Sequence, residues 1–451
     1  NIKSVEVVSN PGARYDASVK AVIRIFTKKV AGEGFGFDNR ALVRHYDAYG
    51  WSAYDQLNLN YRKNGFDLSA MLLAGSYHNG NDQTFVIDTH LDKQWQQNLD
   101  LTDQKAESKN LETTLTLNYQ FNENHSIGAR YNYERVPEYL WIANQFARTY
   151  CEDQLYEDLH GVNTMDEPET HHRTNFYYNG KVKNWSIDFN ADGLWSDTKN
   201  TQVTKENVME GVNEAEDRSV TTIDTKKNEL YATKLVLSHP FVKGNLSFGA
   251  EYSHNKRNTT YLNPEGIITD DEAMIKEGAT SAFVEYAKAF NQLQVQAGLR
   301  YEHVGFDYYN AGKLVDEQSK DYSNLFPSIM LSFPIKDVQV QLGYASDISR
   351  PSYHQLRSNT FYVNRYMYDK GNPFLMPSIT HNVTLGASYK WMNLYVGYSH
   401  VKDDITNQTV AYSDDDPTIG LLTLHNCPAY DKFVAALKIA PTAGCWAPQL
   451  G

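Results

Sequence analysis

Apolar and polar residues alternate along most of this chain with a period of two, and this alternation restricts the fold more than any other feature. In residues 112–121 one set of positions holds Thr113, Leu115, Leu117, Tyr119 and Phe121, and the other holds Glu112, Thr114, Thr116, Asn118 and Gln120. Asn122-Glu123-Asn124 then reverses the chain, and residues 126–134 alternate again. Because successive side chains of a strand point to opposite faces, the sequence predicts a hairpin with one apolar face.

The same period recurs far along the chain, and no helical period persists for long. The further stretches are residues 56–62, 66–74, 185–192, 246–253, 294–302, 338–344 and 383–390. We count roughly sixteen or seventeen strand-like arms, whereas bacterial single-chain barrels have an even number of strands. The predicted fold class is therefore all-β and antiparallel.

Short and long connections alternate between these arms. Short turns are expected at residues 122–124, 183–184, 242–244, 291 and 336–337, and long polar loops at 137–170, 197–222, 256–277, 310–321, 346–377 and 403–420. Short turns on one rim and long loops on the other are typical of a transmembrane β-barrel of the outer membrane. A soluble β-sandwich or propeller would show the same alternation, so the period alone leaves both open.

The composition favours strands that contact lipid over membrane helices. The mean hydropathy is −0.57, and no apolar run is long enough for a spanning helix. Barrel strands average out in this way because lipid-facing apolar residues alternate with polar ones. The 32 Tyr, 19 Phe and 7 Trp often end the apolar stripes, as interfacial aromatic girdles do. The net charge of −13 argues against a nucleic-acid partner.

No catalytic or metal site emerges from the motifs. The chain has no GxSxG, HExxH or P-loop pattern, and Gly32–Gly36 fails the dinucleotide spacing. His171 and His172 would point to opposite faces of a strand. The acidic runs 270–272 and 414–416 are interpreted as solvated turns before calcium sites. Neither an enzyme nor a cofactor is predicted.

The three cysteines are too few and too scattered for a disulfide framework. They are Cys151, Cys427 and Cys445, and no CxxC spacing suggests zinc. Cys427 and Cys445 would be able to pair in an oxidising envelope, but we favour free thiols.

The first thirty residues are similar to the end of the plug domain of TonB-dependent outer-membrane receptors. The similarity lies in a strand (Val5–Val8), an Asn10-Pro11 turn, the pair Tyr15-Asp16, and a strand that ends in Thr-Lys-Lys (Val22–Lys29). The form of this motif with Asn-Pro and Tyr-Asp most resembles the outer-membrane β-barrel receptors that are common in Bacteroidetes. The resemblance implies that residues 1–30 end a plug and residues 31–451 form the barrel. It also implies a contact of Arg14, Tyr15 and Asp16 with the barrel that holds or releases the plug, although a capped turn is the simpler interpretation.

A second resemblance lies in Ile348–Tyr353 and Gly371–Pro377. There Arg350, Pro351, Tyr353, Gly371, Asn372 and Pro373 match family motifs at the bases of a long external loop. Because Pro and Gly fix turn geometry, a structural role is favoured over ligand contact. Tyr362, Tyr366, Tyr368 and Trp141 in the long loops are the candidates for stacking on an external solute.

The resemblance implies an importer of a scarce solute, driven by an inner-membrane TonB energy-coupling complex through a segment that precedes Asn1. The solute would be a siderophore, corrinoid, peptide or glycan, and a surface lipoprotein would be a possible partner beside the outer-membrane lipid. The family barrel has twenty-two strands, so the sequence predicts a C-terminally truncated barrel. The alternatives are a passive or structural outer-membrane barrel and a soluble extracellular glycan-binding β protein.

Overall fold

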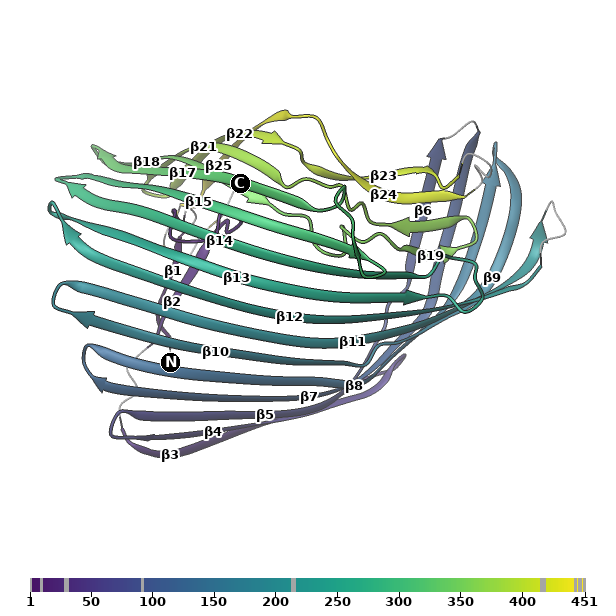
Figure 1. Ribbon diagram of the computed structural model, residues 1–451, viewed down its shortest axis with the longest axis horizontal. Helices are drawn as coiled ribbons and strands as arrows, with labels where there is room; N and C mark the ends of the chain where they lie inside the picture. Colours follow the sequence, from purple (N-terminus) through teal and green to yellow (C-terminus); the bar gives the residue numbers. More distant parts are fainter. Residues whose placement is uncertain are drawn as a thin grey trace.

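The computed structural model describes residues 2–8, 11–27, 32–90, 93–211, 216–413 and 419–441, together with 444 and 448. β1 (Ile2–Val8) and β2 (Val22–Thr27) form a separate two-stranded antiparallel sheet. A large antiparallel sheet curves around this pair (Figure 1). Among the described residues there is no helix that would span a bilayer.

The wall of the molecule is a continuous ladder of paired antiparallel strands from β3 to β25. Its strands are β3 (Gly34–Tyr46), β4 (Gly50–Lys63), β5 (Phe66–Asn79), β7 (Gln94–Asn122), β8 (His125–Cys151), β10 (Glu169–Val182), β11 (Trp185–Gly211), β12 (Arg218–Phe241), β13 (Gly244–Leu262), β14 (Asp271–Phe290), β15 (Leu293–Asn310), β17 (Lys320–Ile335), β18 (Val338–Ser349), β21 (Ser378–Tyr389), β22 (Met392–Lys402) and β25 (Tyr430–Ile439). The described part of the large sheet has 19 strands. The three that complete this number are β6 (Gln83–His90), β9 (Gln154–Asp166) and β16 (Lys313–Leu314), and they pair only with those ends of the wall strands that lie away from the tight turns.

Tight turns join the wall strands along one rim, at the left of Figure 1. Lys183, Val242, Asn291, Lys336 and Lys390 all have positive φ there, between 46° and 55°. Positive φ in a two-residue connection matches the twist of the flanking strands. The predicted short turns are thus confirmed.

The predicted long loops are wrong over much of their length, because strands continue through them. β8 runs on to Cys151 and pairs with β9 across residues 140–151, where a loop from 137 to 170 was expected. β11 likewise continues to Gly211 and pairs with β9 beyond the end of β10. In these extensions apolar and polar residues share both faces, as in residues 140–151, where Ala143 and Ala147 are buried beside Gln145. The two-residue period that identifies a strand is therefore lost.

A second, four-stranded sheet lies among these extensions. It consists of β19 (Thr360–Asn364), β20 (Met367–Lys370), β23 (Ile405–Ala411) and β24 (Gly420–Asn426). β19 and β20 belong to what we call the inner segment, residues 350–377, between β18 and β21. Two buried apolar clusters hold this segment against the wall: Tyr362 and Tyr368 pack with Val220, Tyr261 and Ile268, and Leu356 and Leu375 pack with Ile275, Phe306 and Tyr308.

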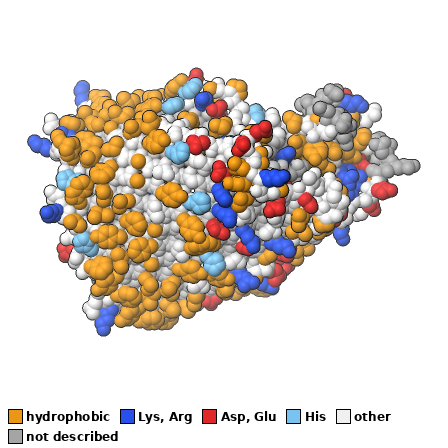
Figure 2. Space-filling model, viewed as in Figure 1, with side chains coloured by type: hydrophobic (Ala, Val, Ile, Leu, Met, Phe, Trp, Pro, Cys, Tyr) orange, Lys and Arg blue, Asp and Glu red, His pale blue; other side chains and the backbone are white. Residues whose placement is uncertain are grey.

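The two faces of the wall differ in chemistry. Leu235, Val284 and Leu299 are 39–45% exposed on the outer face, where the side chains gather into a broad apolar belt bordered by charged residues (Figure 2). Side chains one position away, such as Lys234 and Arg300, contact residues 12–20 inside. The predicted separation of a lipid face from a polar interior is confirmed by this arrangement.

The belt predicts a depth-dependent cost for a charge on the outer face. We expect Val284→Arg to lower the free energy of unfolding by about 2–4 kcal/mol, because the guanidinium would face hydrocarbon. Asn258→Arg, on the same outer face but in the neighbouring β13 and paired with Lys227, should cost at most about 1 kcal/mol. Urea titrations of both variants in lipid vesicles measure the difference, and equal costs would contradict a membrane belt.

Candidate functional site

Residues 12–20, the contact segment, connect β1 to β2 and lie against the inner face of the wall. The segment opens with a tight turn in which Gly12 has a φ of +78° and the Tyr15 amide donates to the Gly12 carbonyl over 3.3 Å. Glycine adopts this left-handed conformation without strain. The turn directs Ala13 into a buried apolar contact with Val236 and Phe283.

The wall approaches the contact segment so closely at Gly298 that no side chain fits there. A Cβ atom at position 298 would lie 2.6 Å from the Cβ of Ala13. Close backbone approach is a common reason for a glycine inside a strand. Gly298 therefore allows the segment to seat on β15.

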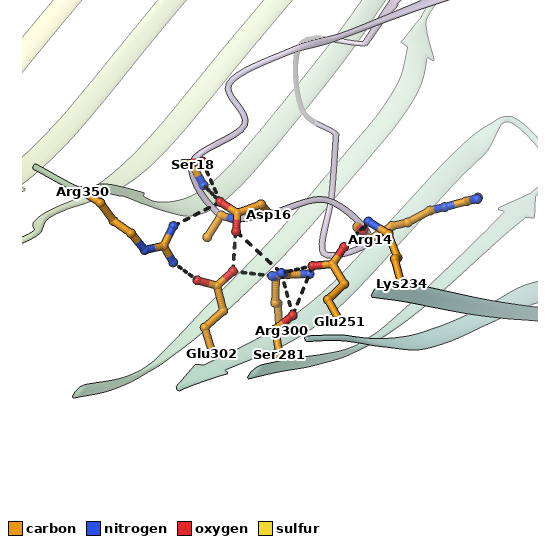
Figure 3. Close-up of polar contacts among 10 residues, drawn as sticks. Arg14, Asp16, Ser18, Lys234, Glu251, Ser281, Arg300, Glu302 and Arg350 are labelled. Atoms are coloured by element: carbon orange, nitrogen blue, oxygen red, sulfur yellow. Dashed lines mark hydrogen bonds and ion pairs between the residues drawn. The ribbon is translucent and has the colours of Figure 1, made fainter. Parts of the chain in front are cut away.

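Asp16 joins this segment to two arginines (Figure 3). Its carboxylate accepts a hydrogen bond from Arg350 Nη1 at 3.3 Å and lies 3.7 Å from Arg300 Nη2. The Ser18 amide and hydroxyl also donate to it, at 2.9 and 2.6 Å. Asp16 thereby links the contact segment to β15 and to the start of the inner segment.

Arg300 is the centre of the cluster and is only 2% exposed. It forms ion pairs with Glu251 of β13 and Glu302 of β15, and donates to the Ser281 hydroxyl of β14 at 2.7 Å. Arg350 forms a second ion pair with Glu302. We call Asp16, Glu251, Arg300, Glu302 and Arg350 the inner ion cluster. With Lys234, which also pairs with Glu251, three cations balance three carboxylates.

Further polar contacts flank the cluster on both sides. Arg14 pairs with Asp188 at 2.9 Å and Lys20 pairs with Asp347 at 2.9 Å. Lys234 Nζ donates to the Arg14 carbonyl at 2.8 Å and lies 5.6 Å from the centre of the Tyr15 ring. The contact segment is thus held almost entirely by charged and hydrogen-bonded groups, with Ala13 as its apolar anchor.

The local electrostatics favour the ionised forms at the junction with the inner segment. Burial by itself would raise the pKa of Asp16, but Arg350, the Ser18 hydrogen bonds and Arg300 outweigh it and hold that pKa below its ordinary value. Burial would lower the pKa of Arg350, but Asp16 and Glu302 reverse this and raise it. Both groups are charged at neutral pH.

The lowered pKa of Asp16 predicts how the segment responds to acid. A carboxylate with a depressed pKa contributes stability above its unfolded value of about 3.9, and loses it as the pH falls through the folded value. A nitroxide attached at position 20 should therefore keep constant mobility from pH 7 to about pH 4 and become mobile below. In Asp16→Asn the label should be mobile at every pH, and identical titrations of the two proteins would contradict the role of Asp16.

The contacts of Arg14, Tyr15 and Asp16 lie where a plug–barrel junction was expected, but sequence reasoning missed their partners on the wall. Arg300, Glu302, Glu251 and Lys234 were noted only as members of polar faces or not at all. The sequence held no signal that separates these residues from the other polar residues that face the interior along barrel strands. Which strands bring them together is a matter of register between distant segments.

The family-motif residues of the inner segment fix its course. The Asn255 amide donates to the Tyr353 hydroxyl at 2.6 Å, and Pro351 follows Arg350 at the end of β18. A Cβ at Gly371 would lie 2.6 Å from the Gln355 carbonyl oxygen. Asn372 donates to the Leu424 carbonyl at 2.9 Å, and the buried Pro373 continues the turn. These contacts fit a structural role for the motif, and that role stays a prediction.

The proposed solute-stacking residues occupy different environments. Tyr362 and Tyr368 are 4% and 5% exposed, and the Tyr362 hydroxyl donates to Glu206 at 2.8 Å. Tyr366 is half-buried against Tyr156, and Trp141 lies in β8, where Nε1 donates to Gln104 at 3.2 Å. In this conformation Tyr362 and Tyr368 are not available to an external solute, because both pack inside a buried apolar cluster.

The remaining candidates are used within the protein or lie outside the described residues. His171 pairs with Glu169 at 3.1 Å, while His172 contacts the Tyr131 hydroxyl. Asp270 and Asp271 accept hydrogen bonds from Asn263 and Asn310, whereas the run 414–416 is outside the described residues. Cys151 and Cys427 are free thiols, and Cys445 is likewise outside. The described part of the chain holds no cluster of metal ligands.

Solved structures with the same fold are outer-membrane receptors. They include the siderophore receptor PirA of Pseudomonas aeruginosa (TM-score 0.58, 14% identity, covering 98% of this chain and 70% of that one). A ferric enterobactin receptor mutant of the same organism has a TM-score of 0.56 at 14% identity, with coverages of 100% and 68%. The hemophore receptor HasR of Serratia marcescens has a TM-score of 0.58 at 11% identity, with coverages of 97% and 66%.

This chain thus spans about two thirds of the length of these receptors, and at such identities the likeness establishes the fold. No curated protein matches the sequence significantly. The sequence profile of the outer membrane protein beta-barrel family, however, matches residues 177–440, more than half of the chain. The profile confirms the outer-membrane location. The chain belongs to the outer membrane protein beta-barrel family.

Proposed function

We propose that this outer-membrane receptor imports a scarce solute by energy-coupled movement of a plug whose last strands are β1 and β2. The observation that supports this is the inner ion cluster. It attaches the contact segment to the wall through ion pairs and hydrogen bonds, which water can replace when the segment shifts, whereas an apolar interface would expose hydrophobic surface. A contact of this kind holds at rest and releases under force.

The proposal assigns residues 1–30 to the plug and residues 31–451 to the barrel. The energy would come from the inner-membrane TonB complex, acting through a segment before Asn1, and the apolar belt would face outer-membrane lipid. A surface lipoprotein is a further possible partner. The solute classes are a siderophore, a corrinoid, a peptide or a glycan, and the fold neighbours named as siderophore and hemophore receptors favour the first.

A depletion experiment tests the function even though the solute has not been identified. Cells that express the full-length gene, and matched cells that lack it, are grown in a mixture of candidate solutes, and mass spectrometry follows the loss of each from the medium. We expect one class to be depleted only by expressing cells and only while the TonB complex is intact. A proton uncoupler should abolish the depletion.

The alternative of a passive or structural barrel predicts a different result. A passive channel would deplete small solutes equally with and without the TonB complex, and a structural barrel would deplete none. The other alternative, a soluble glycan-binding protein, is contradicted by the family match and the exposed apolar belt.

A further inference from the structure

Basic side chains gather where the inner segment lies against β12 and β13, a place that we call the seam. His354 and Arg357 belong to the segment, and Lys226 and Arg257 belong to the inner face of the wall. Burial, Arg357, Lys226 and Arg257 all lower the pKa of His354, and Asp369 opposes them. The neighbouring cations therefore disfavour a proton on His354.

Carboxylates neutralise this group only in part. Asp224 pairs with Lys226 at 2.5 Å, and Asp369 of β20 pairs with Arg357 at 2.8 Å. The Arg257 guanidinium has no ion pair in the described part of the chain. It lies 5.6 Å from the centre of the Tyr353 ring, and its Nε reaches only the Thr259 hydroxyl at 3.5 Å.

Hydrogen-bond donors at the same seam lack partners. Arg357 Nε and the Asn359 amide nitrogen are buried without a hydrogen bond, in residues that are 9% and 5% exposed. An unpaired buried donor is costly, so such groups call for an acceptor that the protein does not supply. Asp224 Oδ1 of β12 and Asn255 Oδ1 of β13 are unpaired acceptors. A water molecule that bridges these acceptors to the unpaired donors is therefore the competing occupant of the site.

His354 is exposed at the edge of the inner segment. Arg357 Nη1 lies 2.8 Å from His354 Nδ1, a contact in which a neutral imidazole must accept. Arg357 also stacks 4.4 Å from the centre of the Phe361 ring. Arg257 of the wall and Arg357 of the inner segment thus each contribute a planar guanidinium, the group whose forked donors pair with carboxylate and phosphate oxygens.

We propose that Lys226 and Arg257 of the wall and Arg357 of the inner segment form a subsite for an anionic group, a carboxylate or a phosphate, of the imported solute. The site rests on the proposed function for its physiological meaning, but the binding itself is measured without transport. Occupation requires the inner segment to shift slightly from the wall. Because this segment begins at Arg350, the site would also report occupancy to the inner ion cluster.

Titration calorimetry of the full-length protein in detergent tests the subsite, with citrate and inorganic phosphate as probes and glucose as the neutral control, at constant ionic strength. We expect saturable binding of at least one anion and none of glucose. Arg257→Gln should weaken that binding about 10-fold or more, because a charge-assisted hydrogen bond is lost. Lys227 follows Lys226 in the chain but lies on the outer face, in an exposed pair with Asp197. Lys227→Gln should therefore leave the anion affinity unchanged.

Arg257→Lys keeps the charge and guards against misfolding, so it should retain part of the affinity. Absence of saturable binding by both anions would overturn the proposal, as would equal weakening by Lys227→Gln or competition by glucose. A protein that binds the anion but fails to deplete any solute would refute the import function and leave the subsite standing.

Discussion

Replacing Arg300 by Met is expected to lower the free energy of unfolding by about 3–5 kcal/mol, because Glu251 and Glu302 then keep only Lys234 and Arg350, and the inner ion cluster carries an uncompensated buried negative charge. The two carboxylates come from different strands and share Arg300 as a partner. Methionine has a similar length and leaves no large cavity, so the loss reports the missing charge. Urea titration of the full-length protein in lipid vesicles, followed by tryptophan fluorescence, measures the effect.

Lys20→Met is the matched control. It also removes one half of an ion pair between the contact segment and the wall, but Lys20 is 60% exposed. Exposed pairs contribute at most about 1 kcal/mol. Arg300→Lys keeps the charge and loses the forked geometry, so it should fall between the two. An Arg300→Met protein within about 1 kcal/mol of the wild type would show that the inner ion cluster is not structurally important.

The wall of this protein could be predicted from sequence because one physical constraint acts on every strand. Wherever one face contacts lipid and the other a polar interior, side chains must alternate, as Leu299 and Tyr301 do with Arg300 and Glu302. Tight turns were equally visible, since Lys336-Asp337 interrupts two such stretches. These features depend only on local sequence.

The constraint ends where the strands leave the membrane. In residues 140–151 both faces are wet or pack against other extensions, so Ala143 and Ala147 are buried beside polar neighbours and no simple period marks the strand. The inner segment shows the same limit. Tyr362 and Tyr368 lie in a region that is polar in sequence, and only the fold of distant strands β12 and β13 buries them.

The sequence indicated only part of the candidate site, for a related reason. Asp16 attracted attention through a resemblance, while its partners Arg300 and Glu302 resembled any other pair on a polar face. Their meeting depends on the path of a segment 285 residues away, which places the Ala17 amide 3.3 Å from Glu302 Oε1. Periodicity carries no information about such pairs.

Locking the contact segment to the wall should abolish import entirely if the segment must leave its seat. The pair Lys20→Cys and Asp347→Cys suits this purpose, because the native side chains form an ion pair at 2.9 Å and neither residue belongs to the inner ion cluster. A bismaleimide with a disulfide between its two reactive ends joins the two cysteines, and a reductant breaks the link. The native thiols Cys151, Cys427 and Cys445 are first replaced by serine. Ser186→Cys with Ser238→Cys, directly opposite in β11 and β12, ties two wall strands together and controls for the reagent.

The central claim is that residues 12–20 separate from the wall during transport, and the uptake rate of the crosslinked Lys20→Cys/Asp347→Cys protein tests it most directly. The solute is the one identified by depletion. We expect uptake at the background level when the crosslink is formed and recovery after reduction, with the Ser186→Cys/Ser238→Cys protein unaffected in both states. Undiminished uptake by the fully crosslinked protein would contradict the claim.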